Sequence, residues 1–253
     1  MKTIVTSVIG LFIALQLQAQ APANIPDKPE MIQVEGGIFN MGSNQESDEK
    51  PVHQVRLSSF KISKYPVTVG QYKAFVAATG RSMPDETPKW GWQDKHPMVY
   101  VNYNDAVAYC NWLGEKYGGD WRLPTEAQWE YAARGGQKSR GYTYAGGNDL
   151  WDVAWFEDNA GGQTQAVGRK KANELGIHDM SGNVWEWCRD WYDGDYYANS
   201  PSSNPRGPSS GANRVLRGGG WFNSAASGRV ANRINYAPSY RTSNRGFRVV
   251  LSQ

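Results

Sequence analysis

The chain has 253 residues, of which 40% are hydrophobic and 20% charged, and it contains 28 glycines and 11 tryptophans. This composition excludes a disordered chain and predicts a folded domain in which irregular backbone is held by large aromatic side chains. The net charge of +3 comes from scattered basic residues, so no basic stripe indicates a nucleic-acid-binding protein.

The N-terminus predicts a secretory signal peptide. Lys2 supplies a positive start to a mostly apolar run, and cleavage is expected before Gln20. No cysteine follows that would carry a lipid, and no other apolar run is long enough to span a membrane. We therefore expect a soluble, exported bacterial protein, periplasmic or secreted, with a signal peptide over residues 1–20, a leader over 21–30 and one domain over 31–253.

The N-terminal half carries both strand and helix patterns. Residues 31–41 and 51–61 alternate apolar and polar positions and predict strands, the first of them broken by glycines. Helical spacing predicts helices over residues 68–79, 104–117 and 125–133. Thr68 and Thr125 are the expected N-caps of the first and third helices, and Gln128 completes a capping box.

Beyond residue 135 the helical period is lost. Short strands are expected at residues 153–155, 166–167, 214–221 and 245–251, and a surface loop at 190–213. We therefore expect a single α+β domain with twisted antiparallel strands, about three helices and many ordered loops.

The stretch at residues 176–187 reads Gly-Ile-His-Asp-Met-Ser-Gly-Asn-Val-Trp-Glu-Trp. Its acidic and amide side chains, Asp179, Asn183 and Glu186, surround Gly182, and oxygen-rich irregular backbone suits a hard cation such as calcium. The alternative is an ordinary turn, capped by Asp179 and followed by a core strand.

Several motifs in order resemble one known family. They are Arg-Leu-Pro-Thr-Glu-Ala-Gln-Trp-Glu at 122–130, Gly-Asn-Val-Trp-Glu-Trp at 182–187, Arg-Val-Leu-Arg-Gly-Gly-Gly-Trp at 214–221 and Gly-Phe-Arg at 246–248. The chain is similar, over about residues 31–251, to the formylglycine-generating enzymes, also called sulfatase-modifying factor domains. This resemblance implies a C-type-lectin-like variant of the α+β domain.

The resemblance also implies a reaction for which this chain lacks the residues. Enzymes of the family oxidise a substrate cysteine with oxygen and a copper ion held by two cysteines, because soft thiolates suit Cu(I). Here Asn223 stands at about the first cysteine position, and the second is missing from a shortened loop. We therefore expect no copper and no catalytic residue of that kind, and whether any other catalysis takes place stays open.

The two cysteines of the chain, Cys110 and Cys188, lie elsewhere. The first falls within the second predicted helix, and the second directly follows the tryptophan motif. The resemblance equates Cys110 with a structural cysteine, whose usual partner position is taken by Val249. A disulfide between the two cysteines and a pair of buried thiols are both open alternatives.

Calcium is implied by the resemblance at two places. At the first, the ligands would be the side chains of Asp179 and Glu186 and the carbonyls of Gly182 and Val184. At the second, Asn159 and the Ala160 carbonyl match the start of the site, but the acidic residue expected downstream is missing from residues 161–168. One structural calcium ion is therefore expected at the tryptophan motif, and the second site is incomplete.

Arginines near the C-terminus divide into two predicted roles. Arg122, Arg233 and Arg248 occupy positions typical of the family and are expected to pair with acids inside the fold. Arg229 is expected to contact a ligand, because the arginine guanidinium can bind an anionic group through two hydrogen bonds. Trp185, Asn223 and the tyrosines and asparagines of residues 190–213 are expected ligand contacts as well.

Three functions remain open from the sequence. The first is an exported, non-catalytic protein that binds a protein, peptide or small-molecule ligand. The second is a divergent oxidoreductase of the same family with an unknown substrate, and the third is a structural component of an envelope assembly. The missing cysteine pair favours the first and third over formylglycine formation, and the fold alone does not choose, because one fold hosts many functions.

Overall fold

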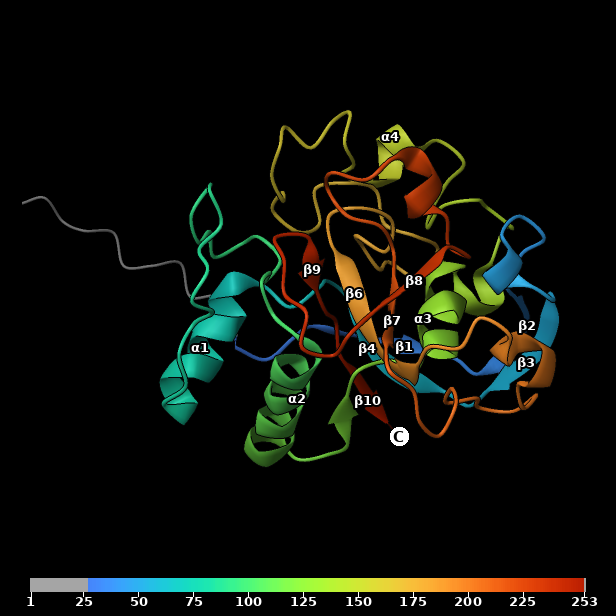
Figure 1. Cartoon of the computed structure of the whole chain (residues 1–253), viewed down its shortest axis with the longest axis horizontal. Helices are drawn as coiled ribbons and strands as arrows, with labels where there is room; N and C mark the ends of the chain where they lie inside the picture. Colours follow the sequence, from blue (N-terminus) through green and yellow to red (C-terminus); the bar gives the residue numbers. More distant parts are fainter. Residues whose placement is uncertain (1–26, 253) are drawn as a thin grey trace, which may run out of the picture.

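In the described part of the chain, two four-stranded sheets and one two-stranded sheet make up the β structure, and helices lie beside them (Figure 1). The computed structural model describes residues 27–252, so the predicted signal peptide and most of the leader lie outside the described residues. The strands are β1 (Met31–Val34), β2 (Gly37–Met41), β3 (His53–Leu57), β4 (Phe60–Ser63), β5 (Trp121–Arg122), β6 (Trp185–Trp191), β7 (Arg214–Arg217), β8 (Arg233–Tyr236), β9 (Arg245–Gly246) and β10 (Val250–Ser252). The helices are α1 (Val69–Thr79), α2 (Tyr103–Tyr117), α3 (Glu126–Ala133), α4 (Leu150–Val153) and α5 (Tyr196–Asn199).

The three longest helices begin at side-chain caps, as the sequence predicts for two of them. Thr68 accepts a hydrogen bond from the third backbone amide of α1, and Thr125 does the same with Gln128 in α3. Asn102 caps α2 in the same way. Capping boxes satisfy amides that have no partner within the helix, which fixes where each helix starts. Gly80 ends α1 in the left-handed conformation, with φ of 69°.

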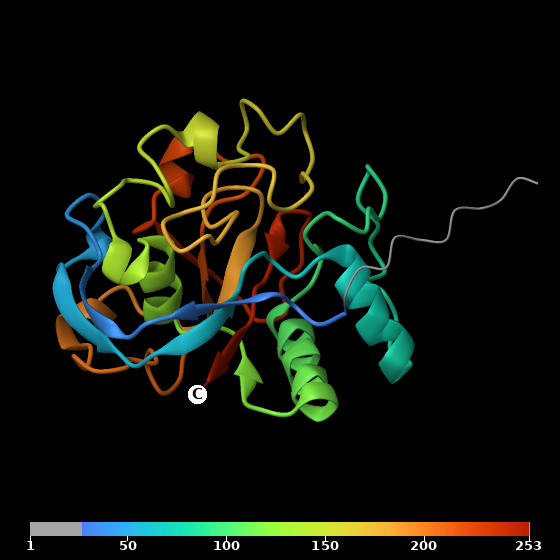
Figure 2. The ribbon, with the colours of Figure 1, turned by 180° about the vertical axis from the view of Figure 1, so that it is seen from behind.

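The first four-stranded sheet has the order β1-β4-β10-β5, and all its neighbours are antiparallel. The second has the order β8-β7-β6-β9, in which β6 and β9 run parallel. Seen from behind, β1 and β4 run together across the molecule, and α1 and α2 lie toward one end (Figure 2). The architecture is the single α+β domain expected from the sequence, although one strand pair departs from the antiparallel pattern.

Two large apolar clusters form most of the core, and a third, smaller one lies at Leu150 and Phe156. One surrounds α3 and includes the fully buried Trp129 and Phe60, whereas the other joins α1 and α2 to the second sheet through Tyr109, Trp187 and Phe247. Burial of large aromatic side chains of this kind supplies most of the free energy that opposes chain entropy. Within residues 27–252 no helix has the length and apolar character needed to cross a membrane.

The structure corrects several predicted elements. Residues 51–61 do not form one strand, because the chain bends at Ser58 and Ser59 between β3 and β4. Residues 153–155 were expected to form a strand, but α4 ends there after a start at which Asp149 accepts a hydrogen bond from an amide of the helix. Residues 166–167 belong to no strand, and β8 has no counterpart among the predicted elements.

Candidate functional site

The tryptophan motif forms a tight turn that leads into β6. Asp179, Gly182 and Asn183 all have positive φ, of 56°, 79° and 66°. A β-carbon at Gly182 would lie 2.4 Å from the carbonyl oxygen of Trp155, so this turn requires glycine. The turn therefore fixes where β6 begins and which way Trp185 points.

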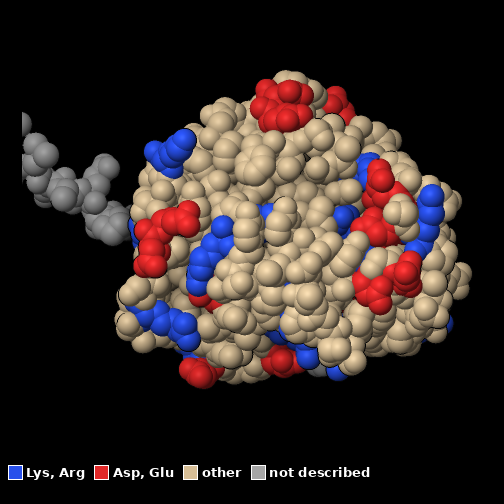
Figure 3. Space-filling model, viewed as in Figure 1, with Lys and Arg blue, Asp and Glu red and all other residues tan. Residues whose placement is uncertain are grey.

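A cleft of about 660 Å³ opens beside this strand, between β8 and the segments at residues 222–227 and 240–245. Its lining is mostly aromatic and polar: Trp185, Phe222, Asn223, Ser227, Arg233, Ile234, Asn235, Tyr236, Tyr240, Thr242, Ser243, Asn244 and Arg245. Figure 3 shows that charged side chains are sparse over the middle of the face that carries β8. The structure thus brings together Trp185 and Asn223, which the sequence analysis singled out as ligand-contacting residues.

Asn223 is held firmly in the wall of this cleft. Its Oδ1 accepts hydrogen bonds from Trp185 Nε1 at 2.9 Å, from the Gly220 amide at 3.2 Å and from Asn244 Nδ2 at 3.4 Å. An amide oxygen with these donors is a hard, neutral acceptor that does not replace a copper-binding thiolate. The residue therefore shapes the wall of the cleft.

The two cysteines do not line the cleft. Cys110 in α2 and Cys188 in β6 are both free and buried, so the structure has two buried thiols in place of a disulfide. Burial raises the pKa of both thiols above the usual range. Because the thiolate is the reactive and metal-binding form, neither cysteine is suited to copper binding or to nucleophilic attack.

Arg245 supplies positive charge to the cleft, and the sequence analysis did not select it. Only 5% of the residue is exposed, and its guanidinium carbon lies 3.8 Å from the ring centre of Tyr236 and 4.6 Å from that of Tyr240. Its Nε has no hydrogen-bond partner, and within residues 27–252 no carboxylate lies within ion-pair distance of it. Burial lowers the pKa of Arg245, so this cation is stabilised by ring faces without a counter-ion.

Arg229 does not have the predicted role. It is 7% exposed, and its two terminal nitrogens donate to the two carboxylate oxygens of Glu49 at 2.9 and 2.7 Å. A guanidinium with both prongs on a buried carboxylate is committed to the fold. The structure therefore corrects the expectation of a ligand contact at Arg229.

The other arginines behave largely as expected. Arg233 pairs with Glu126, and Arg248 pairs with Glu186, with all four side chains buried. Arg122 instead pairs at the surface with Asp120. Two of the three predicted internal pairs are therefore present, and the third lies at the rim of the domain.

The first predicted calcium site contains two buried carboxylates. Burial raises the pKa of both Asp179 and Glu186, and the nearby cation is Arg248. Glu186 accepts from Arg248 through both oxygens and also from Trp129 Nε1, and the Gly182 carbonyl accepts from the Val184 amide. Two buried carboxylates lie near one guanidinium, and a bound cation would favour their ionised forms. The charge of the site therefore fits calcium, whereas Glu186 already has protein partners.

The second predicted calcium site is closed by the protein itself. The side-chain oxygen of Asn159 accepts from the Phe156 amide at 2.9 Å, and the Ala160 carbonyl accepts from Gln165 Nε2 at 2.8 Å. Donors therefore occupy the oxygens that a cation would need. Among residues 27–252 no group of three or more acidic, histidine or cysteine side chains is placed to hold a metal. Calcium at Asn159 and Ala160 therefore stays a prediction, and these two hydrogen bonds would have to open for a cation to bind there.

Comparison with known proteins shows which family the chain belongs to. The family model of the sulfatase-modifying factor enzyme 1-like domain matches residues 16–253. The chain belongs to this family. The formylglycine-generating enzyme of Streptomyces coelicolor is 34% identical over 280 residues, which cover 86% of this chain and 87% of that protein. A protein named chaperone protein LppX, from Paenibacillus barcinonensis, is 32% identical and covers 88% of this chain and 90% of its own length.

A solved structure agrees in fold. PvdO from Pseudomonas aeruginosa superposes with a TM-score of 0.81 at 31% identity, covering 90% of this chain and 96% of that one. The formylglycine-generating-enzyme-like variant of the C-type-lectin fold is thus confirmed. Family membership does not assign the reaction, because the relatives include proteins named for different roles.

Proposed function

We propose that this protein is an exported, non-catalytic member of the family that binds a ligand with an anionic group in the cleft beside Arg245. The observation that carries the proposal is the buried guanidinium of Arg245, which lines the cleft without a carboxylate partner. A desolvated cation gains most from a ligand that brings the missing negative charge. The proposal therefore transfers the predicted ligand-binding role from Arg229 to Arg245.

The aromatic lining supports a ligand that also has a planar or apolar part. Phe222, Tyr236 and Tyr240 are 46%, 38% and 46% exposed, which is unusual for large side chains grouped at one cleft. Ring faces stack on planar groups, and the buried Trp185 closes the inner wall. An aryl or otherwise flat carboxylate satisfies both features of the cleft.

We propose that the protein does not catalyse the family's cysteine oxidation and that it binds one structural calcium ion. Asn223 stands where a copper-binding cysteine is expected, and both thiols of the chain lie buried away from the cleft. Purified protein supplied with Cu(I) and oxygen should therefore not convert a Cys-x-Pro-x-Arg peptide to formylglycine. Turnover detected by mass spectrometry would contradict this.

Calcium is proposed at Asp179 and Glu186, where its charge would offset that of the buried carboxylates.

Binding is tested with a matched pair of probes, phenylacetate and phenylacetamide, by titration calorimetry. Phenylacetate should bind at least about tenfold more tightly, because a charge-assisted hydrogen bond contributes roughly 1.5–3 kcal/mol. Arg245→Gln should abolish that preference. Arg241→Gln is the control, because Arg241 neighbours the cleft but pairs at the surface with Asp105. Equal binding of the two probes, or a preference that survives Arg245→Gln, would refute the proposal.

A further inference from the structure

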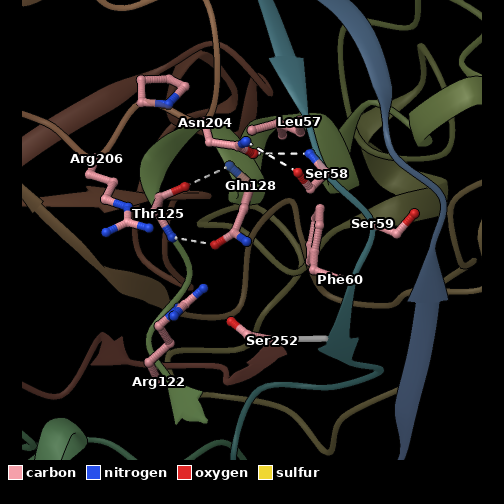
Figure 4. Close-up of a pocket in the computed structure, with 11 residues that line it drawn as sticks. Leu57, Ser58, Ser59, Phe60, Arg122, Thr125, Gln128, Asn204, Arg206 and Ser252 are labelled. Carbon is pink, nitrogen blue, oxygen red and sulfur yellow. Dashed lines mark hydrogen bonds between the residues drawn. The ribbon is translucent and has the colours of Figure 1, made fainter.

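A second hollow, separate from the cleft, lies where the turn between β3 and β4 meets the start of α3 (Figure 4). Its volume is about 170 Å³, and it is lined by Leu57, Ser58, Ser59, Phe60, Arg122, Thr125, Gln128, Asn204, Pro205, Arg206 and Ser252. One water needs roughly 10–15 Å³ of such space, so the hollow has room for a small ligand. We call it the Arg122–Arg206 hollow.

The hydrogen-bond acceptors around this hollow are already used within the protein. Asn204 Oδ1 accepts from the Ser58 amide at 2.9 Å, and Gln128 Oε1 accepts from the Thr125 amide at 3.0 Å. Thr125 Oγ1 accepts from the Gln128 amide at 3.2 Å. Figure 4 shows these bonds on the wall of the hollow. No aspartate or glutamate is among the lining residues.

Two side-chain donors, by contrast, are left without partners. Arg122 Nε and Ser252 Oγ are two of the eight buried side-chain polar atoms that lack a hydrogen bond within residues 27–252. Leaving such a group unsatisfied destabilises the folded state, so two in one hollow point to a missing acceptor. Arg206 adds a second guanidinium to the lining and has no carboxylate within ion-pair distance among residues 27–252.

The charge around the hollow is also positive. Arg122 pairs with Asp120, whose side chain is 61% exposed and does not line the hollow. Burial lowers the pKa of Arg122, and the positive charges of Arg189 and Arg206 act in the same direction. The N-terminus of α3 contributes the positive end of its dipole at Thr125. An anion in the hollow would therefore interact favourably with the guanidinium groups and with the N-terminus of α3.

We propose that the Arg122–Arg206 hollow binds a small tetrahedral oxyanion, sulfate or phosphate, either free or as an ester. Guanidinium groups match the oxygen geometry of such anions, and the Ser252 hydroxyl supplies a donor from another element. The site joins β5, the start of α3, the end of β10 and the segment at residues 204–206. It is independent of the cleft beside Arg245.

The test is titration calorimetry of the folded protein with sodium sulfate and sodium phosphate, at an ionic strength held constant with chloride. One saturable site is expected, and Arg206→Gln should weaken it by at least about tenfold. Arg206 is exposed, so this change should leave the fold intact. Arg169→Gln removes the same charge from an exposed position outside the hollow and should leave the affinity unchanged.

Two outcomes would overturn the proposal. One is the absence of saturable binding for both anions. The other is an equal loss of affinity in Arg206→Gln and Arg169→Gln, which would show general surface attraction. Glucosamine 6-sulfate distinguishes the source of the anion, because competition with free sulfate identifies a site open to esters and its absence confines the site to free ions.

Discussion

Two buried arginines beside α3, Arg217 and Arg233, differ in one respect from the buried Arg245, although Arg233 also lines the cleft. Arg217 reaches Glu126 and Glu130, Arg233 also reaches Glu126, and all of these side chains are buried. Arg245 in the cleft faces aromatic rings and no carboxylate among the described residues. Arginine content by itself therefore says little about function in this fold. The presence or absence of an internal acid separates structural arginines from those free to meet a ligand.

The largest expected effect comes from removing Arg217, which pairs with Glu126 and Glu130. Arg217→Met should destabilise the domain by roughly 3–5 kcal/mol, because it removes the donor to Oε2 of the fully buried Glu130 and one of the two guanidinium partners of Glu126. Arg245→Gln should change the free energy of unfolding by about 1 kcal/mol or less, since it strands no carboxylate. Urea denaturation of both variants measures the difference. Equal destabilisation of the two would show that pairing does not separate these arginines.

The next effect concerns Arg248, which pairs with Glu186 and lies near a second buried carboxylate, Asp179. Calcium at a hundredfold excess over its Kd should stabilise the domain by about 2.7 kcal/mol, which raises Tm by roughly 5 °C or more. Asp179→Gly should abolish the shift, because glycine keeps the positive φ and removes the carboxylate. Thermal unfolding in millimolar calcium and in chelator provides the measurement. The proposal fails if the wild type shows no shift and purifies without calcium.

The smallest expected effect concerns Asp190, a buried acid near Glu126 that forms no ion pair within residues 27–252. Burial, with the nearby charge of Glu126, raises the pKa of Asp190 to about 8 from 3.8. The folded state therefore binds this proton more tightly than the unfolded state, so its contribution to stability falls as the pH rises from about 4 to about 8. Asp190→Asn removes this contribution and keeps an oxygen for the Glu126 amide.

The measurement for Asp190 is the free energy of unfolding of both proteins at pH 5 and pH 8. From pH 5 to pH 8 the wild type should lose on the order of 1 kcal/mol or more relative to the variant. Titrating groups that the two proteins share contribute equally to both stabilities, so the difference between the proteins reports on Asp190. Parallel stability profiles would show that Asp190 is ionised in the folded protein throughout this range.

The helices were predictable because their signals are local. Thr68 and Thr125 cap the helices they were expected to cap, since an N-cap acts over three residues of the same segment. In contrast, α4 has one turn and no period, and β8 depends on its pairing with β7. Structure that depends on distant partners leaves little trace in the sequence of the segment itself.

The site was partly predictable for the same reason. Trp185 belongs to a recognisable motif and Asn223 stands at about the position of a family cysteine, and the structure brings them together at one cleft. Arg229 and Arg245 lie in the same C-terminal segment, and the sequence does not distinguish their surroundings. Glu49, which pairs with Arg229, lies 180 residues earlier in the chain. The choice between a structural and a ligand-facing arginine rests on that long-range contact.

The position of β10 has a consequence for how the protein is made. This strand lies between β4 and β5, and Val250 pairs with both Ile62 and Arg122. While a ribosome synthesises the first two hundred or so residues, both neighbouring strands lack the partner that joins them. Unpaired strand edges invite contact with other chains, and such non-local pairing is slow to form. Closure of the first sheet therefore follows the synthesis of residues 250–252 and does not accompany the earlier stages of translation.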